Sequence, residues 1–155
     1  MIKLLKNAEV YSPNFLGKKD VLIAGDKIFR IEDEIKGYDN AEGVEIFDMS
    51  GMAIVPGYVD KHVHILGGGG EQGPASLVPE PQVSSFVENG VTTAVGLLGI
   101  DGIYRSNEQL VGKARALTED GITVYTLTSN YAFPPTTITE SIERDIVLIT
   151  PMGNF

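Results

Sequence analysis

Apolar and polar positions alternate through the first third of the chain, in short runs separated by turn residues. Two of these runs, residues 2–11 and 19–31, have the pattern of β-strands. Ile23 and Ile28 flank an Ala-Gly-Asp-Lys segment whose Gly-Asp pair suits a tight turn, so we expect a hairpin within the second run. The pattern continues beyond the hairpin, and residues 1–55 are predicted to form a small all-β, sandwich-like unit.

From residue 56 onward, strand-like and helix-like segments alternate. The predicted strands are residues 58–66, 91–99 and 122–130, the last two as buried strands, and the predicted helices start near Pro81, Ser106 and Thr139 with Ser106 and Thr139 as caps. Leu110, Ala114 and Leu117 repeat at helical spacing, and Gly90 and Gly121 suit helix ends. Three strand–helix repeats predict a parallel sheet with right-handed crossovers.

The last predicted helix runs into Pro151 and Gly153, which should break it. A sheet of three parallel strands leaves an open edge and uncovered helix faces. We therefore expect a chain that is cut short and that associates with itself as a homo-oligomer.

Composition and charge narrow the class of protein. Of the 155 residues, 43% are hydrophobic, which is typical of a globular chain. A net charge of −9 and a pI of about 4.6 disfavour nucleic acid and anionic membranes as partners. The chain has no cysteine, which excludes disulfides and thiolate metal sites. Without a recognisable export signal or membrane-length apolar run, the expected location is the cytoplasm.

Both histidines of the chain, His62 and His64, stand one residue apart after an apolar run. Side chains at i and i+2 of a strand share a face, and parallel α/β sheets carry their sites at the carboxyl ends of the strands. Two imidazoles there suit a metal such as zinc, with Asp60 as a further ligand or an acceptor that orients a ring. The alternative is a pair of polar residues hydrogen-bonded to backbone. A zinc site needs three or four ligands, so carboxylates or residues outside this chain must complete it.

Four glycines, residues 67–70, follow the histidines. Such a run adds nothing to a core but is tolerated where backbone approaches a ligand closely or takes a positive φ. Glu71 would then stand at the mouth of the site, and the alternative is a flexible surface loop with a solvated glutamate. The Gly-Lys-Ser/Thr ending of a phosphate-binding loop is absent.

Residues 55–74 resemble the first barrel strand and loop of the amidohydrolase superfamily, whose opening signature is Pro-Gly-Phe/Tyr-Ile/Val-Asp-x-His-x-His. The Gly-Gly-Gly-Gly-Glu extension, Gly-Leu-Leu-Gly at 96–99 and Thr-Ser-Asn-Tyr at 128–131 are similar to the isoaspartyl dipeptidases, or β-aspartyl peptidases. The similarity runs from near Met1 to about Ile149 and covers well under half of a full family member.

The resemblance implies an α/β fold, a (β/α)₈ TIM-type barrel with a small flanking β-sandwich. Residues 1–55 would be the N-terminal part of the small β domain. Residues 56–155 would be the first three β/α units of an incomplete barrel.

The resemblance also implies roles for five residues. His62 and His64 match the pair that binds the more buried of two zinc ions. Glu71 matches a glutamate that holds the substrate's α-amino group, and Gly69 a glycine whose backbone contacts the substrate. Tyr131 matches a loop tyrosine that polarises the scissile carbonyl. Without the resemblance, Tyr131 is more simply a loop aromatic that packs on the Phe-Pro-Pro segment after it.

Some parts of the family pattern are changed or lie outside the chain. Family members usually carry a substrate-contacting threonine where this sequence has Ile100. The carboxylated lysine that bridges the two metals would fall immediately after Phe155, and two histidines, the catalytic aspartate and substrate-binding arginines lie on later strands. We therefore expect at most one partial, weaker zinc site here, and no activity from this chain alone.

The function implied for the parent family is that of a hydrolase and metalloprotease whose two zinc ions activate water against β-aspartyl dipeptides, a small substrate. It would clear isoaspartyl linkages from damaged asparagine and aspartate. One alternative is an amidohydrolase acting on another amide or a cyclic amide, against which Glu71 and its four glycines argue. Another is a non-catalytic truncated remnant.

Overall fold

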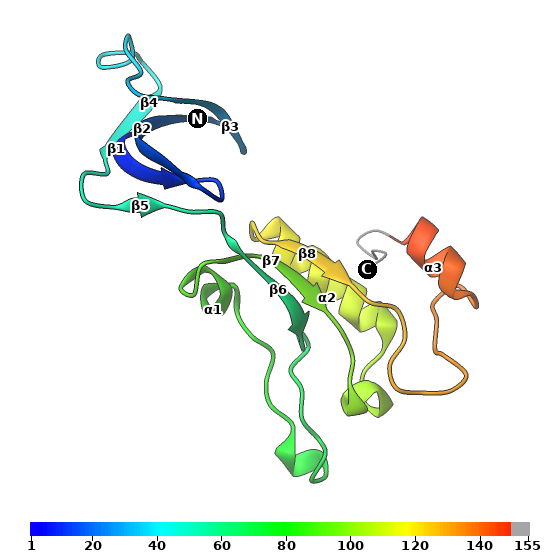
Figure 1. The fold of residues 1–155 in the computed structure, drawn as a ribbon. Helices are drawn as coiled ribbons and strands as arrows, with labels where there is room; N and C mark the ends of the chain where they lie inside the picture. The colour runs from blue at the N-terminus through cyan, green and yellow to red at the C-terminus, as the bar shows by residue number, and fades with distance from the viewer. Residues whose placement is uncertain (150–155) are drawn as a thin grey trace. The chain divides into compact units, whose positions relative to one another are not determined.

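The computed structural model describes residues 1–149, and the chain divides into two compact units, Met1–Pro56 and Gly57–Phe155 (Figure 1). Buried apolar residues form separate clusters in each unit. The two units are therefore described one after the other. The expected break of the last helix at Pro151 and Gly153 lies outside the described residues.

The first unit is a single five-stranded sheet. Its strands are β1 (Ile2–Tyr11), β2 (Phe15–Ala24), β3 (Lys27–Glu32), β4 (Val44–Asp48) and β5 (Ala53–Ile54). The order is β3-β2-β1-β4, with β5 also paired to β1. Strands β1, β2 and β3 are antiparallel neighbours, so the predicted hairpin is confirmed, and Gly25 in its turn has a φ of 64°. A second layer of the predicted sandwich is not among the described residues.

A bulge in β1 is held by a buried carboxylate. The pairing of β1 with β2 shifts register between Leu5 and Ala8, and Asn7 in the bulge has a φ of 65°. The Asn7 N–H donates to Asp20 Oδ1 at 2.9 Å, and the Ile35 N–H donates to Asp20 Oδ2 at 2.9 Å. Asp20 is only 3% exposed, and it thereby fixes both the bulge and the segment that follows β3.

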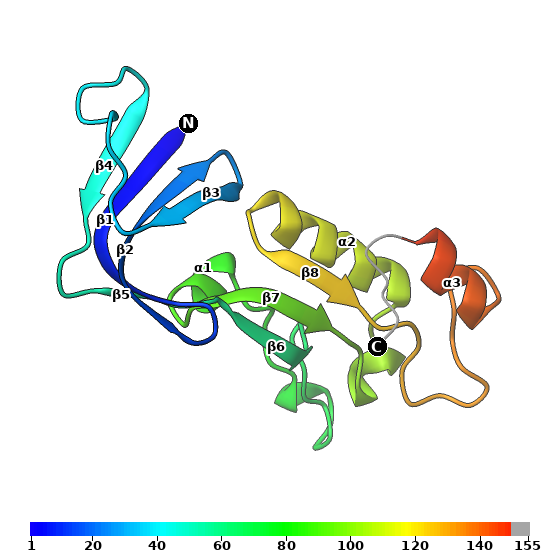
Figure 2. The ribbon, with the colours of Figure 1, turned by 45° about the horizontal axis from the view of Figure 1, so that its top comes forward.

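The second unit contains a parallel sheet of three strands. These are β6 (Tyr58–Val63), β7 (Val91–Gly96) and β8 (Thr123–Thr126), in the order β6-β7-β8. The helices are η1 (Pro74–Ser76), α1 (Val83–Val87), η2 (Ile100–Ile103), α2 (Asn107–Glu119) and α3 (Ile142–Leu148). Figure 2 shows the three arrowheads pointing the same way, with α2 alongside β8. This alternation confirms the predicted α/β class and the parallel sheet, while closure into a barrel stays a prediction.

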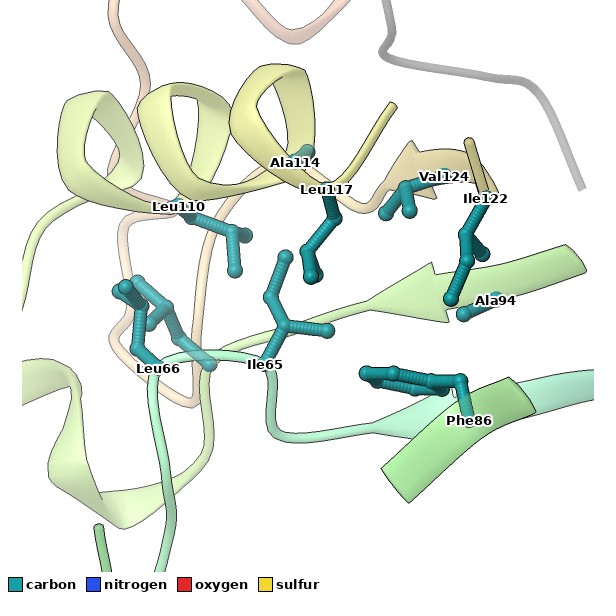
Figure 3. Packing of buried hydrophobic residues seen from close by; sticks show 10 residues of the cluster. Ile65, Leu66, Phe86, Ala94, Leu110, Ala114, Leu117, Ile122 and Val124 are labelled. Carbon is teal, nitrogen blue, oxygen red and sulfur yellow. The ribbon is translucent and has the colours of Figure 1, made fainter. Parts of the chain in front are cut away.

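Helix α2 covers one face of this sheet. Its Leu110, Ala114 and Leu117 are fully or almost fully buried and point at Ile65 and at the strands (Figure 3). The other members of this core are Leu66, Phe86, Ala94, Leu98, Ile122 and Val124. Because the apolar residues recur at helical spacing, the sequence pattern correctly predicted which face of α2 is buried.

The ends of the α-helices follow the predictions in part. Ser106 caps α2 with a full capping box, in which its Oγ accepts from the Gln109 N–H and its own N–H donates to Gln109 Oε1. The predicted Thr139 cap is wrong, because Ser141 caps α3 by accepting from the Arg144 N–H. The Thr139 hydroxyl binds a buried carboxylate instead.

All three predicted strands of the second unit are shorter than expected, with β7 ending at Gly96 and β8 at Thr126. Strand β6 ends at Val63, so His64 lies just beyond it. Strand β8 alternates between exposed and buried residues rather than being buried throughout, because it is the last strand in the described sheet and α2 packs on one of its faces. No helix in residues 1–149 is both long and apolar enough to cross a membrane.

Candidate active site

The segments with candidate functional residues all leave the same edge of the parallel sheet. Residues 64–82 follow β6, residues 97–106 follow β7, and residues 127–141 follow β8. Figure 2 shows these segments emerging at the arrowhead ends of the strands. Backbone hydrogen bonds, Leu97 N–H to Val63 O and Leu127 N–H to Gly96 O, link neighbouring strand ends at this edge.

The two histidines lie next to each other at this edge. Their ring centroids are 5.5 Å apart and the rings meet edge to face, at 60°. His62 is exposed in the last part of β6, and the His64 side chain is 31% exposed. Asp60 Oδ1 accepts from the His62 backbone N–H at 3.1 Å, and among the described residues Asp60 makes no hydrogen bond to either ring.

The His64 ring is enclosed on three sides. A Cβ added to Gly99 would lie 2.7 Å from His64 Cε1, and one added to Gly68 would lie 3.1 Å from His64 Cγ. Nδ1 is buried without a hydrogen-bond partner and faces Asp101 Oδ1 at 3.7 Å. The ring position therefore depends on two glycines and one buried carboxylate.

Asp101, which is buried, and Arg105, which is half-buried, form an ion pair behind His64. Asp101 is 1% exposed, its Oδ1 accepts from the Gly99 N–H at 2.8 Å, and its Oδ2 accepts from Arg105 Nη1 at 2.7 Å. The guanidinium also donates to Gly67 O at 2.9 Å and to Val78 O at 3.4 Å. The sequence analysis did not predict this pair. The one feature of the local sequence that indicates it is the spacing of two opposite charges, four residues apart, after an apolar strand.

Residues 67–78, which we call the glycine loop, fold back on themselves. Gly67, Gly69 and Gly70 have φ values of 80°, 80° and 98°, which glycine adopts without strain. Side chains would also collide with the returning backbone, since an added Cβ would lie 2.1 Å from Val78 O at Gly67 and 2.4 Å from Ser76 O at Gly69. The glycines are thus required by the loop's own packing.

Ser76 is at the centre of the glycine loop. Its Oγ accepts from the N–H groups of Gly70 and Gln72, at 3.2 and 3.3 Å, and donates to Gly73 O at 2.8 Å. The Val78 N–H donates to Gly68 O at 2.9 Å and closes the base of the loop. Within the described residues, Glu71 is exposed and makes no hydrogen bond or ion pair, so its carboxylate is open to a cation.

Tyr131 lines a pocket at the same sheet edge. The pocket has a volume of about 290 Å³ and is lined by Gly99, Ile100, Ile103, Asn130, Tyr131 and Ala132. Tyr131 is 75% exposed, and Asn130 beside it donates to Gly102 O at 3.2 Å, which ties this loop to η2. The structure therefore brings Tyr131 and Ile100 together. Ile100 offers an apolar side chain there and no hydrogen bond.

A second buried carboxylate anchors the Tyr131 loop from behind. Asp145 of α3 is 0% exposed and accepts from the hydroxyls of Thr128 and Thr139 and from the N–H groups of Ile138 and Thr139. Burial alone would raise the pKa of Asp145, but these four hydrogen bonds outweigh it and hold the pKa below its ordinary value. Asp145 therefore stays ionised near neutral pH.

The described residues hold only part of a metal site. Among residues 1–149, no group of three or more histidine and carboxylate side chains is close enough to hold a metal ion. His62 and His64 supply two nitrogen donors, and any further ligand must come from elsewhere.

Similarity to known proteins covers nearly the whole chain. No protein-family model matches. The structure of β-aspartyl dipeptidase from Fervidobacterium islandicum AW-1 matches with a TM-score of 0.93 and 45% identity, over 98% of this chain and 41% of that one. A second structure of that protein, in complex with the β-Asp-Leu dipeptide, matches with a TM-score of 0.90. A D-hydantoinase from Thermus sp., 21% identical with a TM-score of 0.59, shares the fold.

Curated relatives extend the comparison. The dihydroorotase of Pediococcus pentosaceus is 31% identical over 115 residues, which are 72% of this chain and 25% of that protein. The dihydroorotase of Lactobacillus johnsonii is 47% identical over 64 residues, 41% of this chain and 14% of that protein. The chain thus spans only a quarter of the first of these relatives and about two fifths of the dipeptidase.

The fold and these similarities confirm the resemblance to the amidohydrolase superfamily. Within the superfamily, the chain is similar over nearly its whole length to β-aspartyl dipeptidase, as its sequence motifs predicted.

Proposed function

We propose that residues 1–149 carry the first part of the active site of a metal-dependent dipeptidase that hydrolyses β-aspartyl bonds. The observation that supports this most directly is the His62–His64 pair, which lies at the same sheet edge as the Tyr131 pocket in a chain 45% identical to β-aspartyl dipeptidase. The substrate would be a small dipeptide.

The two histidines fit one side of a zinc site. Their rings are neighbours, and with Nδ1 of His64 turned toward Asp101, its Nε2 is the nitrogen left to bind metal. Zinc, when bound, would supply a Lewis acid that polarises the amide carbonyl and lowers the pKa of water. Two donors hold zinc weakly, so we propose that the complete site needs ligands outside residues 1–149 and that this chain alone is inactive.

Three residues would handle the substrate. The unpaired Glu71 carboxylate would bind the α-amino group of the aspartyl residue, and the Gly69 backbone would contact the substrate beside it. The Tyr131 phenol, exposed over the pocket, would donate a hydrogen bond to the oxygen of the scissile carbonyl as negative charge develops there. Ile100 would contribute only apolar contact.

The similarity to two dihydroorotases supports a second candidate function, hydrolysis of a cyclic amide such as dihydroorotate. Glu71 separates the two candidates. A free α-amino group is cationic and suits an unpaired carboxylate, whereas dihydroorotate is an anion that this carboxylate would repel. We therefore place the dipeptide first.

The test joins residues 1–149 of this chain to the part of the Fervidobacterium dipeptidase that follows the matched region. The chimera would be assayed with zinc and bicarbonate for leucine release from β-Asp-Leu, with α-Asp-Leu and dihydroorotate as competing substrates. The same chimera carrying His62→Ala and His64→Ala is the control for metal dependence, and Glu71→Gln is the control for recognition of the amino group.

We expect release from β-Asp-Leu alone, with the double histidine variant inactive and Glu71→Gln raising KM more than it lowers kcat. Turnover of dihydroorotate in preference to β-Asp-Leu would establish the second candidate. A folded, zinc-loaded chimera with neither activity would reject both. The 155-residue chain assayed alone should release no leucine.

A further inference from the structure

We infer that the pair formed by the buried Asp101 and the half-buried Arg105 is a positioning device that sets the orientation of His64 and holds the glycine loop closed. The inference rests on the proposed function, since it assigns the residues that prepare the candidate metal ligand. It is carried by contacts that neither the motifs nor the comparisons indicate. Neither residue of the pair would touch the substrate.

The carboxylate is aimed at one atom of His64. Both oxygens of Asp101 are already occupied, one by the Gly99 N–H and one by Arg105 Nη1, yet Oδ1 also faces His64 Nδ1 at 3.7 Å. Nδ1 is buried and makes no hydrogen bond within the described residues, and Asp101 Oδ1 is the charged oxygen that faces it. An N–H at Nδ1 points a donor at a carboxylate, whereas a bare Nδ1 would point a lone pair at it. The geometry therefore selects the tautomer with the proton on Nδ1 and leaves Nε2 as the metal donor.

Steric contacts keep the ring from turning away. A Cβ at Gly99 would collide with His64 Cε1 at 2.7 Å, and a Cβ at Gly68 would be a tight contact with Cγ at 3.1 Å. With Gly99 this close, the ring has little room to move in that direction, and we infer that Asp101 acts on the choice of the nitrogen that carries the proton. This contact favours glycine at position 99, where the backbone (φ −107°, ψ −138°) also lies outside the usual α and β regions.

The Arg105 guanidinium holds the base of the glycine loop. Arg105 Nη1 is shared between Asp101 Oδ2 and Gly67 O, and Nη2 reaches Val78 O. Gly67 and Val78 are the two ends of the glycine loop, so one planar group spans its base. A lysine ammonium is a single point of positive charge and cannot reach acceptors on both sides of this base. The ion pair thereby couples the orientation of His64 to the closure of the loop that carries Glu71.

A purely stabilising role explains the pair less well. Removing two charges from water is unfavourable, and an apolar pair of similar volume is often as stable or more so. What an apolar pair cannot supply is an acceptor for an imidazole N–H and a fork of donors for two backbone carbonyls. The number and direction of these contacts point to positioning.

The test uses the metal-free 155-residue chain and nuclear magnetic resonance. Because the chain has only two histidines, a long-range ¹H–¹⁵N spectrum contains two imidazoles, and His62→Gln assigns them. We expect His64 to carry its proton on Nδ1 in the wild type. Asp101→Asn should shift it toward the Nε2–H tautomer. Asp145→Asn, which alters the other buried carboxylate of this unit, should leave the tautomer of His64 unchanged.

Arg105→Lys tests the loop. The Val78 amide, which closes the base of the loop, should exchange with solvent at least about tenfold faster in this variant. Arg30→Lys, in the surface pair with Glu32, is the matched control and should leave the exchange rate of this amide unchanged.

Finding the proton of wild-type His64 on Nε2 would overturn the inference. This test needs no variant, so it can be made even if Asp101→Asn does not fold. A folded Asp101→Asn with an unchanged tautomer, or Val78 exchange within twofold of wild type in Arg105→Lys, would also overturn it.

Zinc binding separates this inference from the proposed function. If the pair positions a ligand, Asp101→Asn should bind zinc about tenfold more weakly than wild type, the lower end of the usual effect of such partners. If the tautomer and exchange results hold but the wild-type chain and the chimera fail to bind zinc, the metal assignment fails while the pair still positions His64. If zinc binds and turnover occurs with the tautomer unaffected by Asp101→Asn, the proposed function stands and this inference fails.

Discussion

Replacing Asp145 by asparagine should loosen the segment that carries Tyr131. Each carboxylate oxygen of Asp145 receives one hydroxyl and one backbone N–H: Oδ2 from Thr128 Oγ1 at 2.6 Å and Ile138 N at 3.0 Å, Oδ1 from Thr139 Oγ1 at 2.7 Å and Thr139 N at 2.8 Å. Hydroxyls can turn to accept from an amide, but a backbone N–H cannot. In either orientation, the asparagine NH₂ therefore faces a backbone N–H.

The expected loss follows from this arrangement. A hydrogen bond to a charged acceptor contributes about 1.5–3 kcal/mol, and a buried donor left without a partner costs about 1–3 kcal/mol. These terms overlap, so we expect Asp145→Asn to lower the local unfolding free energy by about 3 kcal/mol. Because asparagine matches aspartate in size and Asp145 is 0% exposed, packing should contribute little to the change.

Amide hydrogen exchange measures this directly. The exchange rates of the Ile138 and Thr139 amides should rise on the order of a hundredfold in Asp145→Asn. Glu143→Gln is the control, because Glu143 is an exposed acid on the same helix whose carboxylate makes no hydrogen bond with Ile138 or Thr139 and accepts from the Ser141 hydroxyl and its own backbone N–H. If the two amides exchange less than about threefold faster in Asp145→Asn, the carboxylate does not anchor the segment and the reasoning is wrong.

Three further predictions follow from the same contacts. The pKa of Asp145 is below its ordinary value in the folded chain, so its stabilisation is complete above the unfolded pKa of about 3.9 and is lost as the pH falls through the folded pKa. The protection of the Ile138 amide, corrected for intrinsic exchange, should therefore be constant from about pH 7 to 5 and fall below about pH 4. In Asp145→Asn this protection should not change with pH over the same range. Gly99→Ala should displace the ring of His64 and weaken zinc binding about tenfold or more. The control is Gly112→Ala, at a position of α2 with open space, which should leave zinc binding unchanged. Thermal unfolding should show that this control raises the stability by about 0.5–1 kcal/mol. Ser76→Ala should speed Gly70 amide exchange severalfold, and an unchanged rate would show that the Ser76 hydroxyl does not organise the glycine loop.

Local patterns in the sequence were enough to predict much of the fold. The strand β1, the β2–β3 hairpin, the buried face of α2 and its Ser106 cap all follow from residues within a few positions of one another. The placement of His62 and His64 at the carboxyl edge of a parallel sheet was predicted for the same reason, because strand–helix alternation determines which end of a strand bears the loops.

Other predictions failed where a contact from elsewhere outweighed the local signal. Thr139 has the residue type of a helix cap, but its hydroxyl binds Asp145 and Ser141 caps α3 instead. The exposed half of β8 depends on the position of that strand in the sheet, which no short window of sequence encodes.

The sequence by itself determined which elements form, where the candidate ligands lie along them, and the family that the motifs resemble. Only the tertiary structure decided what surrounds those ligands. Arg105 reaches Gly67, 38 residues away. Asp101, in the segment after β7, faces the ring of His64, in the segment after the neighbouring strand β6, at 3.7 Å. Helical and strand periodicity describe neighbours along one element. Contacts between separate loops depend on how the sheet brings its strand ends together, so the Asp101–Arg105 pair could be recognised only once the chain was folded.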